Sequence, residues 1–245
     1  MLVHGFAEDG DIWSNQQDFL KDHFRLIVPD IPGSGQSDLV PGASIETYAE
    51  ILKLILDKEL EPTSTGKQEQ VSIIGHSMGG YITLAFAERY PEYLRSFGLF
   101  HSSAFPDNEE KKQTRKKAID FIRDKGSQPF LKTSIPGLFT EAYADKFPEK
   151  VEALIEKGKT FTADALVQYY EAMIARPDRT EVLKTFPGPI LFIIGEFDNA
   201  IPLQSSLQQC YLPSQSHVHV LKASAHMGML EETDKANQIL LDFLL

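Results

Sequence analysis

One short segment, Gly75-His76-Ser77-Met78-Gly79-Gly80, constrains this chain more than any other. The apolar residues Val71, Ile73 and Ile74 before it favour a buried strand, and the apolar residues of 81–90 after it recur at helical spacing. Ser77 is therefore predicted to lie on a sharp strand-to-helix turn, which is the context that a G-x-S-x-G match requires. Glycines at positions 75 and 79 suit a turn that leaves little room for side chains.

Two interpretations of this turn differ in the role of Ser77. As a nucleophile, Ser77 would stand at the carboxyl end of the strand, with the Met78 N–H and the positive end of a helix facing a developing oxyanion. Alternatively, the segment is only a glycine-rich turn, in which serine caps the helix as a favoured N-cap residue. A base, a carboxylate and a second N–H donor elsewhere in the chain would favour the first interpretation.

The overall composition limits the fold and the partners. A chain of 245 residues, 42% hydrophobic and 24% charged, is typical of a globular protein with a sizeable core. The net charge of -11 disfavours nucleic acid and anionic membranes as partners, and no apolar run is long enough to span a membrane. Cys210 is the single cysteine, and the chain opens without a secretory segment. We therefore expect a cytoplasmic protein that acts on a small molecule.

Strand-like and helical segments alternate along most of the chain. Beyond the strand before Ser77, the pattern predicts strands at 1–3, 24–28, 94–100, 189–194 and 216–221, and helices at 12–20, 44–61, 203–211 and up to residue 245. This alternation is typical of parallel βαβ units and predicts a doubly wound, mainly parallel α/β sheet. Gly33 and Gly35 resemble part of a phosphate-binding loop, but no complete fingerprint follows them.

The segment between about 102 and 185 contains no predicted strand. Helices are expected at 109–125, 147–159 and 162–176, and the apolar residues among them need a surface to bury against. We therefore expect a core of 1–101 and 186–245, with a helical cap of 102–185 inserted between core strands and covering Ser77. The basic residues of the first cap helix are interspersed with acidic ones and are expected to be solvated; they are Lys111, Lys112, Arg115, Lys116 and Lys117.

His226 and Asp198 are the candidates for the base and the carboxylate. Each follows a predicted strand at the sheet edge where Ser77 emerges, although a lone histidine is more often structural than catalytic. Glu196 is the rival carboxylate, but Asp198 lies further out in its turn, from which a side chain can bend back toward an imidazole. The second oxyanion donor is assigned to the Phe6 N–H, and His4 is expected to brace that loop.

Together these motifs resemble the α/β-hydrolase superfamily, in its small esterase and haloperoxidase-like branch. The resemblance rests on His4-Gly5-Phe6, Asp30–Ser37, Gly75–Gly80, Gly195–Asp198 and Ala225-His226. It implies a triad of Ser77, Asp198 and His226 and an oxyanion hole of the Phe6 and Met78 amides. Members of the superfamily usually have two strands before the His-Gly loop, and this sequence lacks them. The fold is therefore expected to have six parallel strands, with 24–28 at an exposed edge that offers a contact for a homodimer.

The leading hypothesis from the resemblance is a carboxylesterase-like serine hydrolase without metal or cofactor. A mainly apolar substrate pocket is expected, with contributions from His76, Phe139, Tyr169, Met173 and Met227. Serine at the nucleophile position disfavours dehalogenase and epoxide hydrolase chemistry, which use aspartate there. Thioesterase, lactonase, C–C hydrolase and perhydrolase activities stay open because they use the same triad, and so does a non-catalytic ligand receptor.

Overall fold

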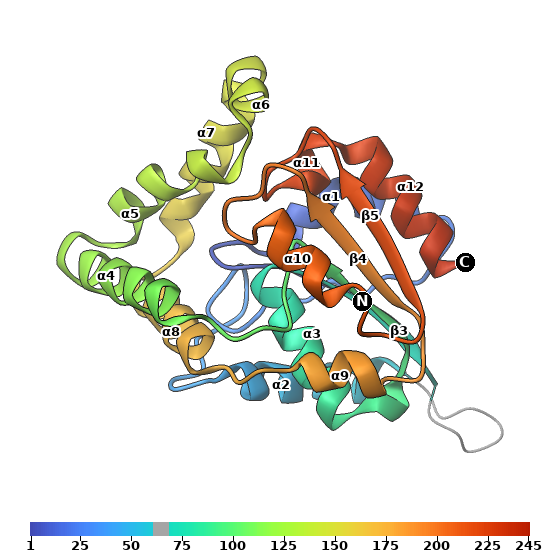
Figure 1. Cartoon of the computed structure of the whole chain (residues 1–245). Coiled ribbons are helices and arrows are strands. Elements are labelled where there is room, and N and C mark those ends of the chain that lie inside the picture. Colours follow the sequence, from blue (N-terminus) through green and yellow to red (C-terminus); the bar gives the residue numbers. More distant parts are fainter. Residues whose placement is uncertain (61–68) are drawn as a thin grey trace.

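The computed structural model describes residues 1–60 and 69–245 (Figure 1). Within these residues the core is a parallel sheet in the order β1-β2-β3-β4-β5. The strands are β1 (Leu2–Val3), β2 (Val71–His76), β3 (Leu94–Phe100), β4 (Ile190–Gly195) and β5 (Ser216–Leu221). Every residue of β4 is buried, as expected for a parallel strand that is covered on both faces.

Helices cover both faces of the sheet, which confirms the predicted doubly wound α/β fold (Figure 1). On one face, α3 (Met78–Arg89) packs against α2 (Ile45–Glu59) and α9 (Thr180–Thr185). On the other, α1 (Ser14–Leu20) packs against α11 (Gly228–Glu231) and α12 (Thr233–Leu244). The remaining core helix, α10 (Leu203–Gln209), contacts β4.

Local sequence signals account for where several helices begin and end. α2 begins after Ser44, which forms a capping box with Thr47, so the helix starts close to the predicted position 44. The last residue of the predicted helix, 61, lies outside the described residues. Asn108 accepts a hydrogen bond from the Lys111 N–H and starts α4 (Glu109–Lys125), which is followed by Gly126 with φ of 89°. A positive φ favours glycine, so the chain leaves α4 there at little steric cost.

The segment 24–28 does not form a sixth strand, contrary to the prediction. One backbone hydrogen bond joins it to β1, from the Leu2 N–H to the Ile27 carbonyl at 2.9 Å. Because β1 has two residues, it offers too little backbone for a regular ladder on this side. The dimer contact expected at this edge stays a prediction.

The chain segment that follows β3 and precedes β4 forms a layer of helices to one side of the sheet (Figure 1). We call it the α4–α8 layer; it comprises α4 (Glu109–Lys125), α5 (Ser127–Ser134), α6 (Glu141–Lys146), α7 (Pro148–Lys157) and α8 (Ala163–Ala175). It is tied to the core by the His226 N–H, which donates to the Leu138 carbonyl at 2.9 Å. By contrast, α9, which falls within the predicted cap of 102–185, contacts α3 of the core. The cap boundary at 185 stays a prediction.

Candidate active site

Ser77 has a backbone conformation that non-glycine residues rarely adopt, with φ of 50° and ψ of -113°. Its N–H donates to the Phe100 carbonyl at 2.9 Å, and its own carbonyl accepts from the Ser102 hydroxyl at 2.7 Å. A Cβ atom on Gly75 would lie 2.3 Å from the Gly79 carbonyl oxygen, so the turn requires glycine there. The Ser77 side chain makes no capping hydrogen bond to α3, which argues against the interpretation as a simple N-cap.

The structure brings Ser77, His226 and Asp198 into one hydrogen-bonded line. Ser77 Oγ lies 2.9 Å from His226 Nε2, and His226 Nδ1 lies 2.8 Å from Asp198 Oδ2. The other carboxylate oxygen of Asp198 accepts from the N–H groups of Ala200 and Ile201, which fix its orientation. Because the carboxylate can only accept, the imidazole proton belongs on Nδ1 and Nε2 is free to accept from the seryl hydroxyl.

The carboxylate of Asp198 is kept charged at this position. Burial alone would raise the pKa of Asp198, but the neighbouring imidazoles of His226 and His101 lower it well below its usual range. Burial lowers the pKa of His101 to about 4, so this second histidine beside the carboxylate is neutral near pH 7. Glu196, the rival carboxylate, instead lies 3.2 Å from the exposed Lys222 and does not contact His226.

Among the described residues, two backbone amides near Ser77 have no hydrogen-bond acceptor; they are the amides of Phe6 and Met78. The backbone hydrogen bonds of the described turns and loops include none donated by Phe6 or Met78. Met78 is the first residue of α3, so its N–H has no partner within the helix. Phe6 and Ser77 line the same cavity. Free amides next to a seryl hydroxyl are what an oxyanion requires, and we assign this role to them as a proposal.

His4 braces the loop that presents the Phe6 amide. Its Nε2 accepts from the Ile31 N–H at 2.9 Å, and its Nδ1 lies 2.9 Å from the Gly5 carbonyl. The His4 side chain is fully buried. With both ring nitrogens engaged, His4 has none left to act as a base.

His76 and Glu8 form a buried ion pair behind Ser77, which the sequence did not indicate. His76 Nδ1 lies 2.9 Å from Glu8 Oε2, and His76 Nε2 lies 3.0 Å from the His226 carbonyl. Both partners only accept, so both ring nitrogens must carry protons. Burial alone would lower the pKa of His76, but the charge and hydrogen bond of Glu8 raise it overall; against its own burial, the pKa of Glu8 is correspondingly lowered. The imidazolium therefore ties Glu8 to the backbone of His226.

Replacing Glu8 by Gln should destabilise the protein by about 3 kcal/mol near pH 6, because it leaves a buried imidazolium without its counter-charge. Because the pKa of His76 is raised, the stabilisation that protonated His76 gives the folded state is fully present at pH values below the ordinary pKa of about 6.5. It is lost as the pH rises through the raised pKa. Because the pKa of Glu8 is lowered, the stabilisation that ionised Glu8 gives the folded state is fully present at pH values above the ordinary pKa of about 4.3. It is lost as the pH falls through the lowered pKa.

Urea unfolding of wild type and Glu8→Gln therefore should show a stability difference that is largest at about pH 5 to 6 and shrinks toward pH 9. The exposed Glu152 serves as the matched control, and Glu152→Gln should change the unfolding free energy by less than about 0.5 kcal/mol. If the difference in unfolding free energy between wild type and Glu8→Gln stays constant from pH 6 to pH 9, the assignment of Glu8 and His76 as a charged pair is wrong.

A model of the α/β hydrolase fold family matches residues 1–233 of this chain. The chain belongs to the α/β-hydrolase family. It is 25% identical over 268 residues to a 2-hydroxy-6-oxononadienedioate/2-hydroxy-6-oxononatrienedioate hydrolase of Paraburkholderia phymatum, an alignment that covers 100% of this chain and 86% of the relative. A thermophilic esterase from Thermogutta terrifontis shares 29% identity at a TM-score of 0.91, over 99% of this chain and 88% of the esterase. The enol-lactonase of Burkholderia xenovorans, at 22% identity and a TM-score of 0.88 over 99% and 89% of the two chains, shares the fold.

Ser77 and His226 of this α/β-hydrolase line a cavity of about 770 Å³ between the core loops and the α4–α8 layer. Of the predicted pocket residues, Met173 lines this cavity, and Met227 lines a smaller cavity of about 90 Å³ that shares Phe6 and Leu138 with it. The mainly apolar pocket stays a prediction. Charged side chains also form part of the wall of the larger cavity; they are Glu8, Asp107, Glu110, Lys111, Arg115 and Arg176.

The other predicted pocket residues, His76, Phe139 and Tyr169, do not line the cavity, contrary to the prediction. His76 is fully buried behind the nucleophile turn. Phe139 is buried and stacks on Tyr143, with ring centroids 5.4 Å apart. Tyr169 is buried with its hydroxyl donating to the Pro32 carbonyl at 2.9 Å, so its ring packs the layer against the core.

The expectation of a solvated basic face on α4 is wrong for Lys111 and Arg115, which line the cavity. Lys116 and Lys117 are exposed, as expected. A signal for the difference was present in the sequence, since Lys111, Arg115 and the buried Ile119 are spaced four residues apart and share one face of the helix.

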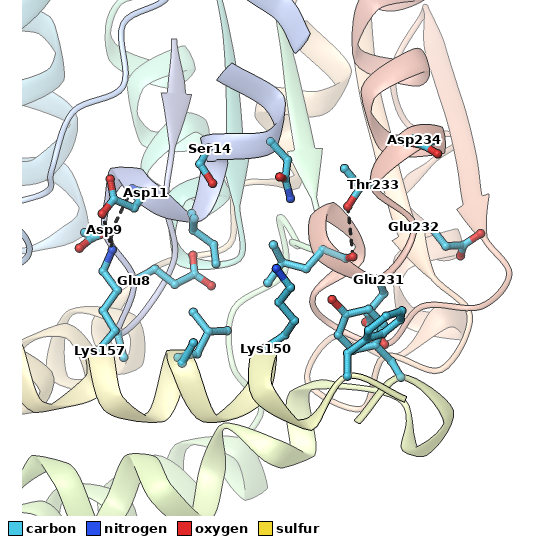
Figure 2. Close-up of a pocket in the computed structure, with 18 of the residues that line it drawn as sticks. Glu8, Asp9, Asp11, Ser14, Lys150, Lys157, Glu231, Glu232, Thr233 and Asp234 are labelled. Carbon is cyan, nitrogen blue, oxygen red and sulfur yellow. Dashed lines mark hydrogen bonds and ion pairs between the residues drawn. The ribbon is translucent and has the colours of Figure 1, made fainter. Parts of the chain in front are cut away.

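A second cavity of about 760 Å³ lies between α7 and the core and reaches neither Ser77 nor His226 (Figure 2). Glu8 lines both large cavities. Lys157, on one wall, forms ion pairs with Asp9 at 2.5 Å and Asp11 at 2.8 Å, which compensate its charge (Figure 2). This cavity therefore lacks the triad.

Among residues 1–60 and 69–245, no group of three or more His, Cys, Asp or Glu side chains could hold a metal ion. None of the described helices is both long and apolar enough to cross a membrane. The cytoplasmic location stays a prediction.

Proposed function

We propose that this α/β-hydrolase cleaves carboxylic esters through an acyl-enzyme on Ser77. The observation that carries the proposal is the line from Ser77 Oγ through the His226 imidazole to Asp198, with distances of 2.9 and 2.8 Å. A seryl hydroxyl is a poor nucleophile at neutral pH and needs such a base. The similarity to the Thermogutta terrifontis esterase favours esters as the substrate class.

In the first half of the reaction, Ser77 Oγ attacks the ester carbonyl carbon while its proton moves to His226 Nε2. Asp198 stabilises the imidazolium that forms and holds its orientation. The carbonyl oxygen becomes an oxyanion that accepts hydrogen bonds from the Phe6 and Met78 amides, and each such donor lowers the barrier by about 3 kcal/mol. The tetrahedral intermediate collapses, and the leaving alkoxide takes the proton from His226.

In the second half, water replaces the alcohol next to His226. His226 Nε2 removes one proton from this water, and the hydroxide oxygen attacks the acyl carbon. The same two amides hold the second oxyanion. Collapse then breaks the bond to Ser77 Oγ, which recovers the proton from His226, and the carboxylic acid leaves.

The relatives also favour a second candidate. Several of them, including the Paraburkholderia phymatum protein, are named as hydrolases of 2-hydroxy-6-oxononadienedioate, and C–C bond hydrolysis would use the same triad. The two candidates differ in the bond that breaks, so a panel that contains simple esters and such a dienedioate separates them by product analysis.

Turnover of p-nitrophenyl acetate and butyrate tests the proposal. We expect release of p-nitrophenolate with a rapid first turnover that matches the enzyme concentration, because the acyl-enzyme accumulates when its hydrolysis is slow. Folding is checked by circular dichroism. A correctly folded protein that releases no p-nitrophenolate above background from either ester would refute the esterase assignment.

A further inference from the structure

Arg115 presents a largely unused guanidinium to the cavity that contains Ser77. Its Nε donates to Asp107 Oδ2 at 2.7 Å, and its guanidinium lies over the Tyr170 ring at 5.4 Å. Its side chain is 12% exposed. In the part of the chain that the structure describes, neither terminal nitrogen of Arg115 meets an acceptor. Arginine carries five N–H donors, so most of them remain available to a bound molecule.

Asp107 does not balance the positive charge around it. Its side chain is fully buried, and its two oxygens are shared between Arg115 at 2.7 Å and Arg176 at 2.9 Å. One carboxylate thus faces two guanidiniums. Arg176 is held in place by the Met173 carbonyl at 2.6 Å and by stacking on the Tyr81 ring at 3.8 Å. Both terminal nitrogens of Arg176 are thus engaged, although its buried Nε meets no acceptor among the described residues. Arg115, by contrast, keeps both terminal nitrogens free within the described part of the chain.

The other charges of the cavity wall do not remove this excess. Glu8 pairs with the His76 imidazolium, and Glu110 is exposed at the start of α4. Lys111 donates to the Ala200 carbonyl at 2.8 Å and adds a further positive charge to the same wall. The region around Arg115 consequently has a positive potential. A neutral ligand would leave the excess positive charge there without a counter-charge.

Tyr81 lies in the same positive potential. It lines the cavity, and its hydroxyl has no hydrogen-bond partner among the described residues. Burial alone would raise the pKa of Tyr81, but the positive charges of Arg176, Lys111 and Arg115 lower it overall. A hydroxyl donor and a free guanidinium therefore face the same cavity as the seryl oxygen.

We propose that the ester substrate carries a carboxylate and that Arg115 binds this carboxylate within the Ser77 cavity. The inference rests on the proposed function and narrows its substrate class to esters with a second, ionised carboxyl group. A guanidinium matches a carboxylate with two parallel N–H···O bonds, and the Tyr81 hydroxyl supplies a further donor. A carboxylate supplies negative charge that this wall lacks, since two guanidiniums share the single carboxylate of Asp107.

Matched ester pairs test the proposal. One arm places the carboxylate on the acyl side, with p-nitrophenyl monoesters of glutaric, adipic and pimelic acid compared with p-nitrophenyl esters of monocarboxylic acids of equal chain length. The other arm places it on the alcohol side, with carboxyphenyl butyrate compared with phenyl butyrate. We expect kcat/KM to favour the carboxylate ester by about tenfold or more in one arm, chiefly through KM, and the preference to fall with added salt.

Substitution of Arg115 provides the direct test. In Arg115→Gln the ratio of kcat/KM between carboxylate and neutral esters should fall by about tenfold or more. Arg115→Lys keeps the positive charge but loses the planar guanidinium, so its ratio of kcat/KM between carboxylate and neutral esters should be intermediate. This variant provides the test if Arg115→Gln does not fold. Arg123, an exposed residue on the same helix that pairs with Glu171, is the matched control, and Arg123→Gln should keep the wild-type ratio.

The outcomes separate the two proposals. Efficient turnover of neutral esters with no preference for a carboxylate in either arm would overturn the inference and leave the esterase intact. A preference that survives both Arg115 substitutions would also overturn it. Failure of the folded enzyme on every ester would instead refute the proposed function.

Discussion

Replacement of Ser77 by alanine should lower kcat for any ester substrate by about ten-thousandfold or more, because the attacking oxygen is removed and no acyl-enzyme can form. The fold should survive. Alanine can occupy the same backbone conformation at the same cost as serine, and the hydrogen bonds that tie the turn to Phe100 and Ser102 use backbone atoms of residue 77. We therefore expect the melting temperature to stay within a few degrees of the wild type.

Ser72 is the matched control for this substitution. It lies on the same strand, β2, and its hydroxyl bonds the Ser96 hydroxyl at 2.7 Å rather than the triad. Ser72→Ala should retain kcat. Ester turnover by Ser77→Ala that approaches the wild-type rate would show that another residue is the nucleophile.

Replacement of Asp198 by asparagine should lower kcat by about ten-thousandfold, through the wrong tautomer of His226. The asparagine oxygen can take the place of Oδ1, which accepts from Ala200 and Ile201, so its NH2 group would face His226 Nδ1. Nδ1 must then accept, and the imidazole proton moves to Nε2. A protonated Nε2 cannot remove the proton of Ser77.

Glu196 offers a control of the same chemistry two residues away. Its carboxylate lies near Lys222 at the surface, so Glu196→Gln should leave kcat nearly unchanged. Steady-state kinetics of both variants at saturating ester gives the comparison. If Glu196→Gln were the more damaging change, the assignment of the orienting carboxylate would be wrong.

The sequence predicted the sheet, the nucleophile turn and the chain order of the candidate triad because each has a local signal. Buried parallel strands such as β4 are apolar throughout, and α4 was predicted with its observed ends at 109 and 125. The position of a residue just after a parallel strand places it at the carboxyl edge of the sheet. This reasoning selected Asp198 and His226 from many acids and several histidines.

The wall of the cavity could not be predicted in the same way, since it depends on how the α4–α8 layer packs on the core. From the sequence, Lys111 and Arg115 are expected to be solvated. In the structure Arg115 pairs with Asp107, which also binds Arg176, and Lys111 donates to the Ala200 carbonyl. The Glu8–His76 pair joins residues 68 positions apart, and no local pattern around either residue indicates that they meet. For 24–28, the apolar pattern was correct, but the shortness of β1 prevented a sixth strand.

Covalent labelling tests the central claim most directly. The intact protein is treated with a fluorophosphonate, digested and mapped by mass spectrometry, with Ser77→Ala and Asp198→Asn treated in parallel. The account predicts one label, on Ser77, with parallel loss of ester turnover, slower labelling of Asp198→Asn and none of Ser77→Ala. Folded, active enzyme that keeps its turnover while unlabelled at Ser77, or that carries the label elsewhere, would contradict it.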